Sequence, residues 1–266
     1  PLTGGKQIVC ENWRNLITVG AKPLAITNCL NFGNPENENI MGEFAECLEG
    51  IREACEFLNY PVVSGNVSFY NGTNQKNINP TPVIGGVGLI NKLSKPISHN
   101  FKKDKNIIIL VGKTFGHLEQ SCFLRENYKI FDGMPPDINL LNEKNNGENV
   151  LKLIQNKLIL SSHDISDGGL ILALCEMSIS SSYGAIIKKP QKLTNLFKYF
   201  FGEDQGRYLL EVEPSNLTKV EKSLKDSNIY YENIGFTQKD FFEIEGELKI
   251  NIKDLFKINN EWYNNY

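Results

Sequence analysis

Residues 61–71, PVVSGNVSFYN, decide how the first part of this 266-residue chain is interpreted. Their β-branched and aromatic residues predict a strand, and the Asn-Gly pair at its end is a turn signal. Alternate side chains of a strand share a face, so Asn66 and Ser68 should project together, about 6–7 Å apart. Gly65 has no Cβ, so a phosphate or a ring can approach its backbone closely. The stretch is a candidate nucleotide-contacting strand, and a plain strand with surface polar residues is the alternative.

The residues on either side of this strand predict an α+β unit that ends near residue 92. Apolar residues at spacings of three and four predict a helix before each of the first two strands. Residues 28–35, rich in Asn, Gly and Pro, predict a loop after the first strand. The expected elements are a helix at 5–20, a strand at 22–27, a helix from Asn37 or Asn39 to 58, and strands at 60–70 and 81–90.

A second unit, of the α/β class, is expected at residues 106–266, after a polar linker at 93–105. Its first strand, 106–112, is a continuous apolar run, which is typical of a strand buried on both faces. Residues 132–149 contain two prolines and are expected to form a loop. The other expected elements are a helix at 149–156, a strand at 158–161, a helix at 170–180 capped by Ser166 or Asp167, helices at 195–201 and 214–225, strands at 206–212 and 230–236, and a terminal hairpin.

Composition is that of a soluble globular protein, with 41% hydrophobic and 22% charged residues. The formal net charge of −3 argues against nucleic acid or an anionic membrane as a partner. The six cysteines form no CxxC pair, and no apolar run reaches about 18 residues, so a cytoplasmic, reducing compartment is expected. The chain starts at Pro1 instead of Met, which suggests that it is entered midway.

Three further polar patches are candidates for chemistry. Residues 27–35 follow a strand, where ligand contacts are common, although an Asx-rich loop also makes its own turns. Residues 162–169, SHDISDGG, join a strand to a helix, and a lone histidine such as His163 is more often structural than catalytic. Residues 201–207, FGEDQGR, place carboxylates beside an arginine, which a loop salt bridge explains equally well. The sequence has neither GxxxxGK[ST] nor GxGxxG, which argues against a P-loop or Rossmann site.

Five motifs, taken together and in this order, resemble the second half of the ATP-using large subunit of the phosphoribosylformylglycinamidine synthase family. They are AKPLAITNCLNFGNPE, PVVSGNVSFYN, TPVIGGVGLI, SSHDISDGGL and FGEDQGR. That family is part of the aminoimidazole-ribonucleotide-synthetase-like superfamily, whose members bind ATP without a P-loop. The resemblance covers nearly the whole chain and implies an N-type domain at residues 1–92, which pairs with a partner N-type domain, and a C-type α/β domain at 106–266.

The resemblance also implies an ATP-dependent ligase of purine biosynthesis, which converts formylglycinamide ribonucleotide to its amidine with glutamine-derived ammonia. Asn28 and Gly65 match ATP contacts, Asn66 matches a Mg²⁺ ligand, and Ser68 matches a substrate contact. The family usually has Asp at the position of Asn28, and an amide supplies no negative charge there. The family's catalytic histidines lie in the half that is absent here, so the resemblance assigns no catalytic residue in this chain and His163 is not one of them.

The implied partners are the preceding half of the same subunit, a glutamine amidotransferase subunit and a small bridging subunit. Without its partner half, the N-type domain should expose an apolar face and self-associate. One alternative is a structural, non-catalytic half, which the missing acid at Asn28 favours. The other is a related ATP enzyme, such as aminoimidazole ribonucleotide synthetase, selenophosphate synthetase or thiamine-monophosphate kinase. Those enzymes carry an Asp-rich motif, whereas residues 1–100 contain no Asp.

Overall fold

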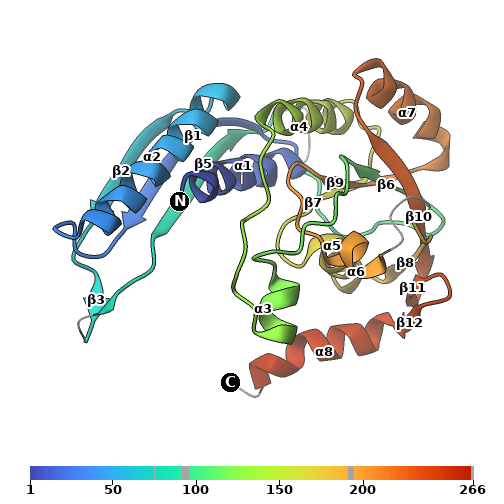
Figure 1. Ribbon diagram of the computed structural model, residues 1–266. Coiled ribbons are helices and arrows are strands. Elements are labelled where there is room, and N and C mark those ends of the chain that lie inside the picture. The colour runs from blue at the N-terminus through green and yellow to red at the C-terminus, as the bar shows by residue number, and fades with distance from the viewer. Residues whose placement is uncertain (75, 92–95, 191–194, 265–266) are drawn as a thin grey trace.

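Two β-sheets organise the chain in the computed structural model, which describes residues 1–74, 76–91, 96–190 and 195–264 (Figure 1). A three-stranded sheet carries the first part of the chain, and a seven-stranded sheet carries the rest. A short ribbon of β3 (Gly72–Thr73) and β4 (Lys76–Asn77) extends from the smaller sheet. This arrangement agrees with the predicted α+β unit followed by an α/β unit. Within the described ranges, no helix is both long and apolar enough to cross a membrane.

The smaller sheet has the strand order β2-β1-β5. Its central strand β1 (Lys22–Asn31) is parallel to β2 (Val62–Ser68) and antiparallel to β5 (Thr81–Leu89). α1 (Leu2–Thr18) and α2 (Glu38–Leu58) pack on one face of this sheet. The side chain of Asn37 accepts a hydrogen bond from the backbone N–H of Asn39, which confirms Asn37 as the cap of α2.

α1 and α2 approach each other closely because each has a glycine where they cross. A Cβ on Gly5 would lie 2.3 Å from the carbonyl oxygen of Cys47, and a Cβ on Gly50 would lie 2.0 Å from that of Leu2. Both distances are far below van der Waals contact, so any side chain at either position would push the helices apart. The close crossing lets the apolar stripe of α1 and the buried side chains of α2 share one core with the sheet.

β1 is longer than the sequence predicts. Residues 28–31, expected to form a loop, continue the strand and pair on both sides; Asn28, for example, lies opposite Gly65 of β2 and Ile84 of β5. A central strand offers backbone partners along both edges, and this pairing outweighs the turn preference of asparagine. The loop is therefore confined to residues 32–37.

The larger sheet has the order β12-β11-β8-β10-β6-β9-β7. Two of its inner strands, β6 (Ile107–Val111) and β9 (Tyr208–Val212), place alternate side chains into two separate cores. Ile108 and Leu110 pack with α5 (Gly169–Ile179) and α6 (Leu196–Phe201). The other strands are β7 (Ser161–Asp164), β8 (Tyr183–Ile187), β10 (Tyr231–Lys239), β11 (Phe241–Ile244) and β12 (Leu248–Asn251).

The second core joins the two sheets. Ile109 and Val111 of β6 pack in the same cluster as α4 (Leu140–Gln155), α7 (Leu217–Asp226) and the apolar face of α1. α7 follows a single turn of 3₁₀ helix, η1 (Pro214–Asn216). Because α1 covers the smaller sheet and also contacts the larger one, this core is shared by the two units.

Several predictions for the second unit are wrong. α4 begins at Leu140, well before residue 149, because one side of this asparagine-rich segment is buried and favours the helix despite the low propensity of Asn. β7 lies three residues later than predicted, where it pairs with β9. The chain also forms α3 (Cys122–Tyr128), β8 and α8 (Ile252–Asn264), none of which was predicted.

The end of the predicted linker is anchored to the larger sheet. Residues 92–95 lie outside the described residues, and Phe101 is 1% exposed within the α5–α6 core. The buried carboxylate of Glu211 in β9 accepts hydrogen bonds from the backbone N–H groups of Lys102 and Lys103. This pairing fixes the entry of the chain into β6.

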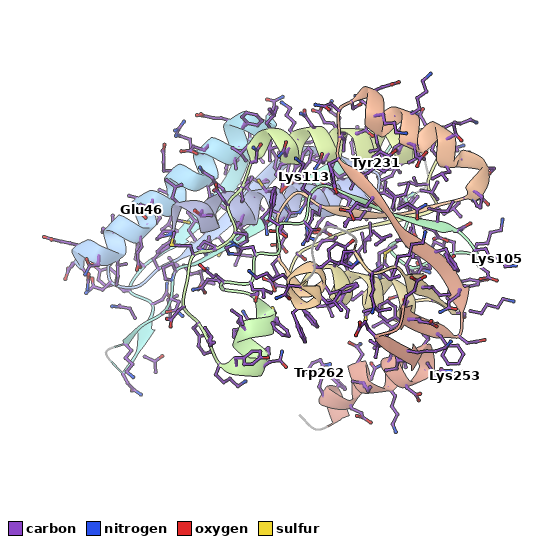
Figure 2. All side chains as sticks on the ribbon, turned by 45° about the vertical axis from the view of Figure 1, so that its right-hand side comes forward. Glu46, Lys105, Lys113, Tyr231, Lys253 and Trp262 are labelled. Atoms are coloured by element: carbon purple, nitrogen blue, oxygen red, sulfur yellow. The ribbon has the colours of Figure 1, made fainter. Side chains whose placement is uncertain are left out.

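Two side-chain donors complete the shell of the Glu211 carboxylate. The Asn106 amide donates at 2.7 Å and the Ser161 hydroxyl also at 2.7 Å, so the buried charge is fully hydrogen-bonded. Many charged side chains are exposed, and Figure 2 shows Lys105 and Lys253 at the periphery.

Candidate functional site

The four predicted site residues all lie along the seam between β1 and β2. Asn28 of β1 lies opposite Gly65 of β2, and Asn66 and Ser68 follow along β2 toward its carboxyl end. The polar patch at residues 27–35 and the patch at residues 61–71 therefore meet in space, because β1 and β2 are adjacent and parallel. Regular strand geometry is sufficient to bring them together.

A glycine is needed at position 65 because the side chain of Asn28 leaves no room for a Cβ there. The same lack of a side chain leaves the backbone open to a ligand. A Cβ at this position would lie 1.9 Å from the side-chain Oδ1 of Asn28 and 2.7 Å from its carbonyl oxygen. The Asn28 side chain thus occupies the space above the glycine, and the two residues form one unit on the same face. Val63 and Val67, on that face of β2, are 68% and 48% exposed and offer an apolar surface on either side.

Asn66 and Ser68 lie on the opposite face of β2 from Gly65, as strand alternation requires. Within the described ranges, the exposed side chain of Asn66 makes no hydrogen bond. The hydroxyl of Ser68 lies 3.2 Å from the side-chain oxygen of Asn71 and 3.1 Å from its nitrogen. Asn71 is held in turn by the carbonyl of Phe32, so the Ser68 hydroxyl has a fixed neighbour, whereas the Asn66 amide is free to bind.

β2 is an edge strand, and this position makes both of its faces accessible to one ligand. A ligand that lies over the open edge can approach the Gly65 backbone and also reach the Asn66 and Ser68 side chains. The free backbone groups of an edge strand are additional hydrogen-bonding partners. The seam therefore suits a ligand that has both a ring and polar oxygens.

The seam supplies only neutral oxygens to a metal ion. Neither β1 nor β2 contains a carboxylate. The amide oxygen of Asn66 can be one ligand of Mg²⁺, which usually keeps several waters and phosphate oxygens. Over the described residues, the group with potential metal-ligand geometry is Cys122, Asp167 and Glu203, which belongs to the larger sheet's unit. The residues present fit a Mg²⁺ ion that arrives with phosphates, and they do not form an all-protein site.

The patches SHDISDGG and FGEDQGR meet at the start of α5. The sequence predicts a cap at Ser166 or Asp167, but Gly168 is the cap residue and makes no side-chain hydrogen bond. Instead, the Glu203 carboxylate accepts hydrogen bonds from the backbone N–H of Gly168 and of Cys122, both at 2.8 Å. A carboxylate at this helix end is favoured by the helix dipole.

His163 is held in an ionic network. Its Nε2 lies 3.1 Å from a carboxylate oxygen of Glu176, and its Nδ1 lies 2.6 Å from the carbonyl oxygen of Asp164. Burial lowers the pKa of His163, but hydrogen bonds to Asp164 and Glu176 outweigh it and raise the pKa to about 10. A histidine that stays protonated at neutral pH is a poor general base, which agrees with the structural interpretation.

Asp204 organises the loop that follows β6. Its carboxylate accepts hydrogen bonds from three consecutive backbone N–H groups, those of Phe115, Gly116 and His117, at 2.9–3.2 Å. Arg207 is fully buried and donates to the carbonyl oxygens of Asp204 and Gly202, so it forms no simple loop salt bridge. The patch FGEDQGR thus holds the local backbone.

A buried ion pair at the junction of the two units was not predicted. Arg14 of α1 pairs with Glu143 of α4, and both side chains are almost completely buried. The Arg14 guanidinium also donates to the side-chain oxygen of Gln205 at 3.0 Å and lies 3.7 Å from Asp164. Burial raises the pKa of Glu143, and the adjacent Arg14 opposes this shift. A separation of 129 residues leaves no local signal for the pair.

Family models match both parts of the chain. The AIR synthase related protein N-terminal domain matches residues 1–90, and the AIR synthase related protein C-terminal domain matches residues 105–244. The chain is 53% identical over 266 residues to the phosphoribosylformylglycinamidine synthase subunit PurL of Pelagibacter ubique, and 45% identical to that of Rhodopseudomonas palustris. In both cases all of the chain aligns with 36% of the relative's length.

Solved structures share the fold at low sequence identity. PurL of Thermotoga maritima complexed with ATP matches with a TM-score of 0.73 at 15% identity, over 96% of this chain and 41% of that one. The same protein complexed with FGAR matches with a TM-score of 0.74 at 15% identity, over 96% and 43%. These likenesses support the arrangement of two units described above.

Proposed function

This chain belongs to the AIR synthase related protein family, and we propose that it forms the second half of an ATP-using phosphoribosylformylglycinamidine synthase subunit. One observation carries the proposal: the whole chain aligns at 53% identity with the curated synthase subunit of Pelagibacter ubique. Because the alignment covers 36% of that subunit, the complete activity requires residues beyond those of this chain. The names of these relatives favour the synthase over the other ATP enzymes of the superfamily.

The proposed reaction activates an amide oxygen. ATP transfers its γ-phosphoryl group to the amide oxygen of formylglycinamide ribonucleotide, ammonia adds to the amide carbon, and phosphate leaves, which gives the amidine, ADP and phosphate. The protein's contribution is to position the reactants and to stabilise phosphate charge. A Mg²⁺ ion bound with the phosphates would neutralise part of that charge.

The β1–β2 seam supplies one wall of the proposed site. Asn28 and Gly65 bind ATP, with the exposed valines beside Gly65 packing on the base, and Asn66 adds one oxygen to the Mg²⁺ shell. Ser68, fixed by Asn71, donates to the ribonucleotide substrate. No side chain of the seam is a suitable acid or base, so we place the catalytic groups in the preceding half.

The uncovered face of the smaller sheet supports a partner. Val83, Val87 and Leu89 of β5 are 52%, 60% and 61% exposed on the face that α1 and α2 leave open. We propose that the preceding half packs here, that a glutamine amidotransferase subunit and a small bridging subunit complete the assembly, and that it works in the cytoplasm. The six cysteines are free thiols, which suits a reducing compartment.

The test combines this chain with the preceding part of the Pelagibacter ubique subunit, supplied as a separate polypeptide. Amidine formation from formylglycinamide ribonucleotide, Mg-ATP and ammonium chloride should require both polypeptides. Asn66→Ala should raise the KM for Mg-ATP, and Ser68→Ala should raise the KM for the ribonucleotide alone. Asn259→Ala and Ser215→Ala, at exposed positions away from the seam, serve as controls. If Asn66→Ala and Ser68→Ala behave as these controls do, the site assignment is wrong.

A structural half is the second candidate, and the absence of carboxylates from β1 and β2 favours it. In that case the chain would still be needed for assembly, but calorimetry with Mg-ATP would detect no binding that depends on Asn28 or Asn66. Retained turnover in the Asn28→Ala and Asn66→Ala variants would support this role over the catalytic one.

A further inference from the structure

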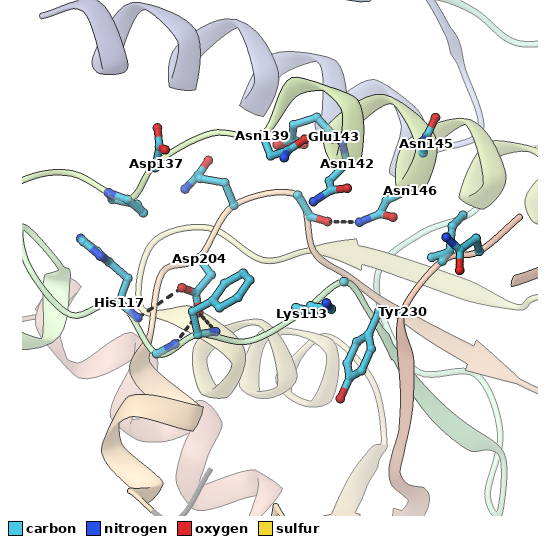
Figure 3. Close-up of a pocket in the computed structure, with 18 of the residues that line it drawn as sticks. Lys113, His117, Asp137, Asn139, Asn142, Glu143, Asn145, Asn146, Asp204 and Tyr230 are labelled. Carbon is cyan, nitrogen blue, oxygen red and sulfur yellow. Dashed lines mark hydrogen bonds between the residues drawn. The ribbon is translucent and has the colours of Figure 1, made fainter. Parts of the chain in front are cut away.

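A cavity of about 1010 Å³ opens in the unit of the larger sheet, between α4, the loop after β6 and the start of β10 (Figure 3). Ligand pockets usually enclose about 300–1,000 Å³, so this space is large enough for a mononucleotide. None of the four seam residues lines it. Its lining includes the side chains of Lys113, Asn142, Asn145, Lys225 and Tyr230.

The α4 side of the cavity is lined with free amides. Asn142 and Asn145 project from the first two turns of α4, and within the described ranges neither side chain makes a hydrogen bond. An amide both donates and accepts, so a row of amides recognises hydroxyl groups or the edge of a base. Asn146, in contrast, is already used, because it donates to the carbonyl oxygen of Gly206.

A buried carboxylate on the same side holds α4 in place. Glu143 is 1% exposed, and one of its oxygens pairs with Arg14. The backbone N–H of Gly206 also acts on this carboxylate, and its other oxygen, Oε2, is closed off from solvent. Buried carboxylates are nearly always paired or hydrogen-bonded, so Glu143 anchors this wall of the cavity and is not itself a ligand contact.

Two cations face this polar wall. Lys113 comes from the loop after β6, and Lys225 lies in the last turn of α7; over the described residues neither forms a salt bridge. The ammonium of Lys113 lies 5.8 Å from the centre of the Tyr230 ring. Of the two aspartates at the cavity, Asp204 is held by hydrogen bonds from three backbone N–H groups, and Asp137 accepts from the N–H of Ile138 at the exposed rim. An anionic group is therefore favoured beside the lysines.

We infer that this cavity binds a ribose phosphate, either free or as part of a mononucleotide. The phosphate lies between Lys113 and Lys225, and the sugar hydroxyls exchange hydrogen bonds with the side chains of Asn142 and Asn145. In a mononucleotide, the ring of Tyr230 gives the base a surface to stack on. The inference does not rest on the proposed synthase function, because the seam and the cavity have no residue in common.

Isothermal titration of the 266-residue chain with ribose 5-phosphate, AMP, ribose and inorganic phosphate tests this assignment. Ribose 5-phosphate should bind more tightly than ribose or inorganic phosphate, and AMP more tightly still if the base takes part. Lys113→Met and Lys225→Met should each weaken ribose 5-phosphate binding about tenfold, the low end for a hydrogen bond to a charged group. Lys222→Met, on the same helix as Lys225 and exposed outside the cavity, should leave affinity unchanged.

Asn142→Leu should reduce the preference for ribose 5-phosphate over inorganic phosphate, because it deletes one of the two amide contacts to the sugar and keeps both lysines. Asn66→Ala on the seam should change nothing, which separates this site from the proposed ATP site. Absence of binding to the wild-type chain, equal affinity for inorganic phosphate, or equal losses in Lys222→Met and Lys225→Met would each overturn the inference.

Discussion

The two sheets differ in how completely their faces are covered. Every residue of 108–111 in β6 is fully buried, because helices cover both faces of the larger sheet. In β5 of the smaller sheet, exposed and partly buried residues alternate along the whole strand, and the exposed ones include Val83 and Val87. The larger sheet is complete within this chain, whereas the smaller one has an apolar face without cover. The candidate ATP site lies on the incomplete sheet, so ligand binding and partner docking involve the same element.

The largest loss of stability is expected when the ion pair at the junction between the two units is removed. Arg14→Met leaves Glu143 buried without its cation, which should lower the free energy of unfolding by about 3–5 kcal/mol in urea denaturation. Arg52→Met is the matched control, since Arg52 is half exposed and its surface pairs with Glu49 and Glu56 contribute little to stability.

The double variant Arg14→Met/Glu143→Leu should recover most of that loss, because it removes both charges and keeps the packed volume. If Arg14→Met lowers the free energy of unfolding no more than Arg52→Met does, the Arg14–Glu143 pair does not stabilise the contact between the two units.

A second change acts within the smaller unit alone. Gly50→Val places a side chain against the carbonyl oxygen of Leu2 and should lower the free energy of unfolding by about 1–3 kcal/mol, the usual cost of overpacking. Gly42 lies on the same helix, and no atom lies within 4 Å of the place that a Cβ would take there, so Gly42→Ala should stabilise by up to about 1 kcal/mol. Equal effects of the two changes would contradict the close crossing of α1 and α2.

Alkaline pH should weaken the larger unit. The pKa of His163 is about 10 in the folded protein against 6.5 in the unfolded chain, so its contribution is fully present below pH 6.5 and is lost as pH rises toward 10. Each unit of pKa shift corresponds to about 1.4 kcal/mol, so the decline should exceed about 1 kcal/mol. Urea denaturation between pH 6 and pH 10 should show a flatter profile for His163→Gln than for the wild-type chain. If the free energy of unfolding of His163→Gln falls with pH as steeply as that of the wild-type chain, the ionic network around His163 is not the cause of the decline.

The smallest effect on stability is expected on the open face. Val83→Lys/Val87→Lys should change the free energy of unfolding by less than about 0.5 kcal/mol, since both side chains are more than half exposed. Light scattering should show that the wild-type chain self-associates and that this variant does not. Leu248→Lys, at a similarly exposed position in β12 of the larger sheet, should leave self-association unchanged. A monomeric wild-type chain would contradict the incomplete-sheet interpretation.

The sequence predicted those features whose signal is local. The apolar run of β6, the Asn37 cap of α2 and the order of the two units are all confirmed, because each depends on neighbouring residues. The start of α4 was missed because its asparagines are typical of loops, although they line a cavity on one side of a helix. The extension of β1 was missed because both of its partners are distant in the sequence.

In the candidate site, too, the features with a local signal were predicted and those that depend on tertiary contacts were not. Strand alternation correctly placed Asn66 and Ser68 on one face, and it also places Gly65 on the other, beside Asn28. The roles of these residues remain predictions. The ion pair of Arg14 and Glu143 and the meeting of Lys113 with α4 depend on tertiary packing, which no short segment encodes.

The carboxylate of Asp204 holds the loop after β6 in its conformation without any ligand. Consecutive backbone N–H groups that converge in this way form a nest of the kind that commonly binds phosphate. Here the chain fills the nest with its own anion, so the loop is ordered during folding and not upon binding. The entropy cost of shaping this wall of the cavity is therefore already met before a ligand arrives, and the affinity of an incoming molecule is not reduced by it.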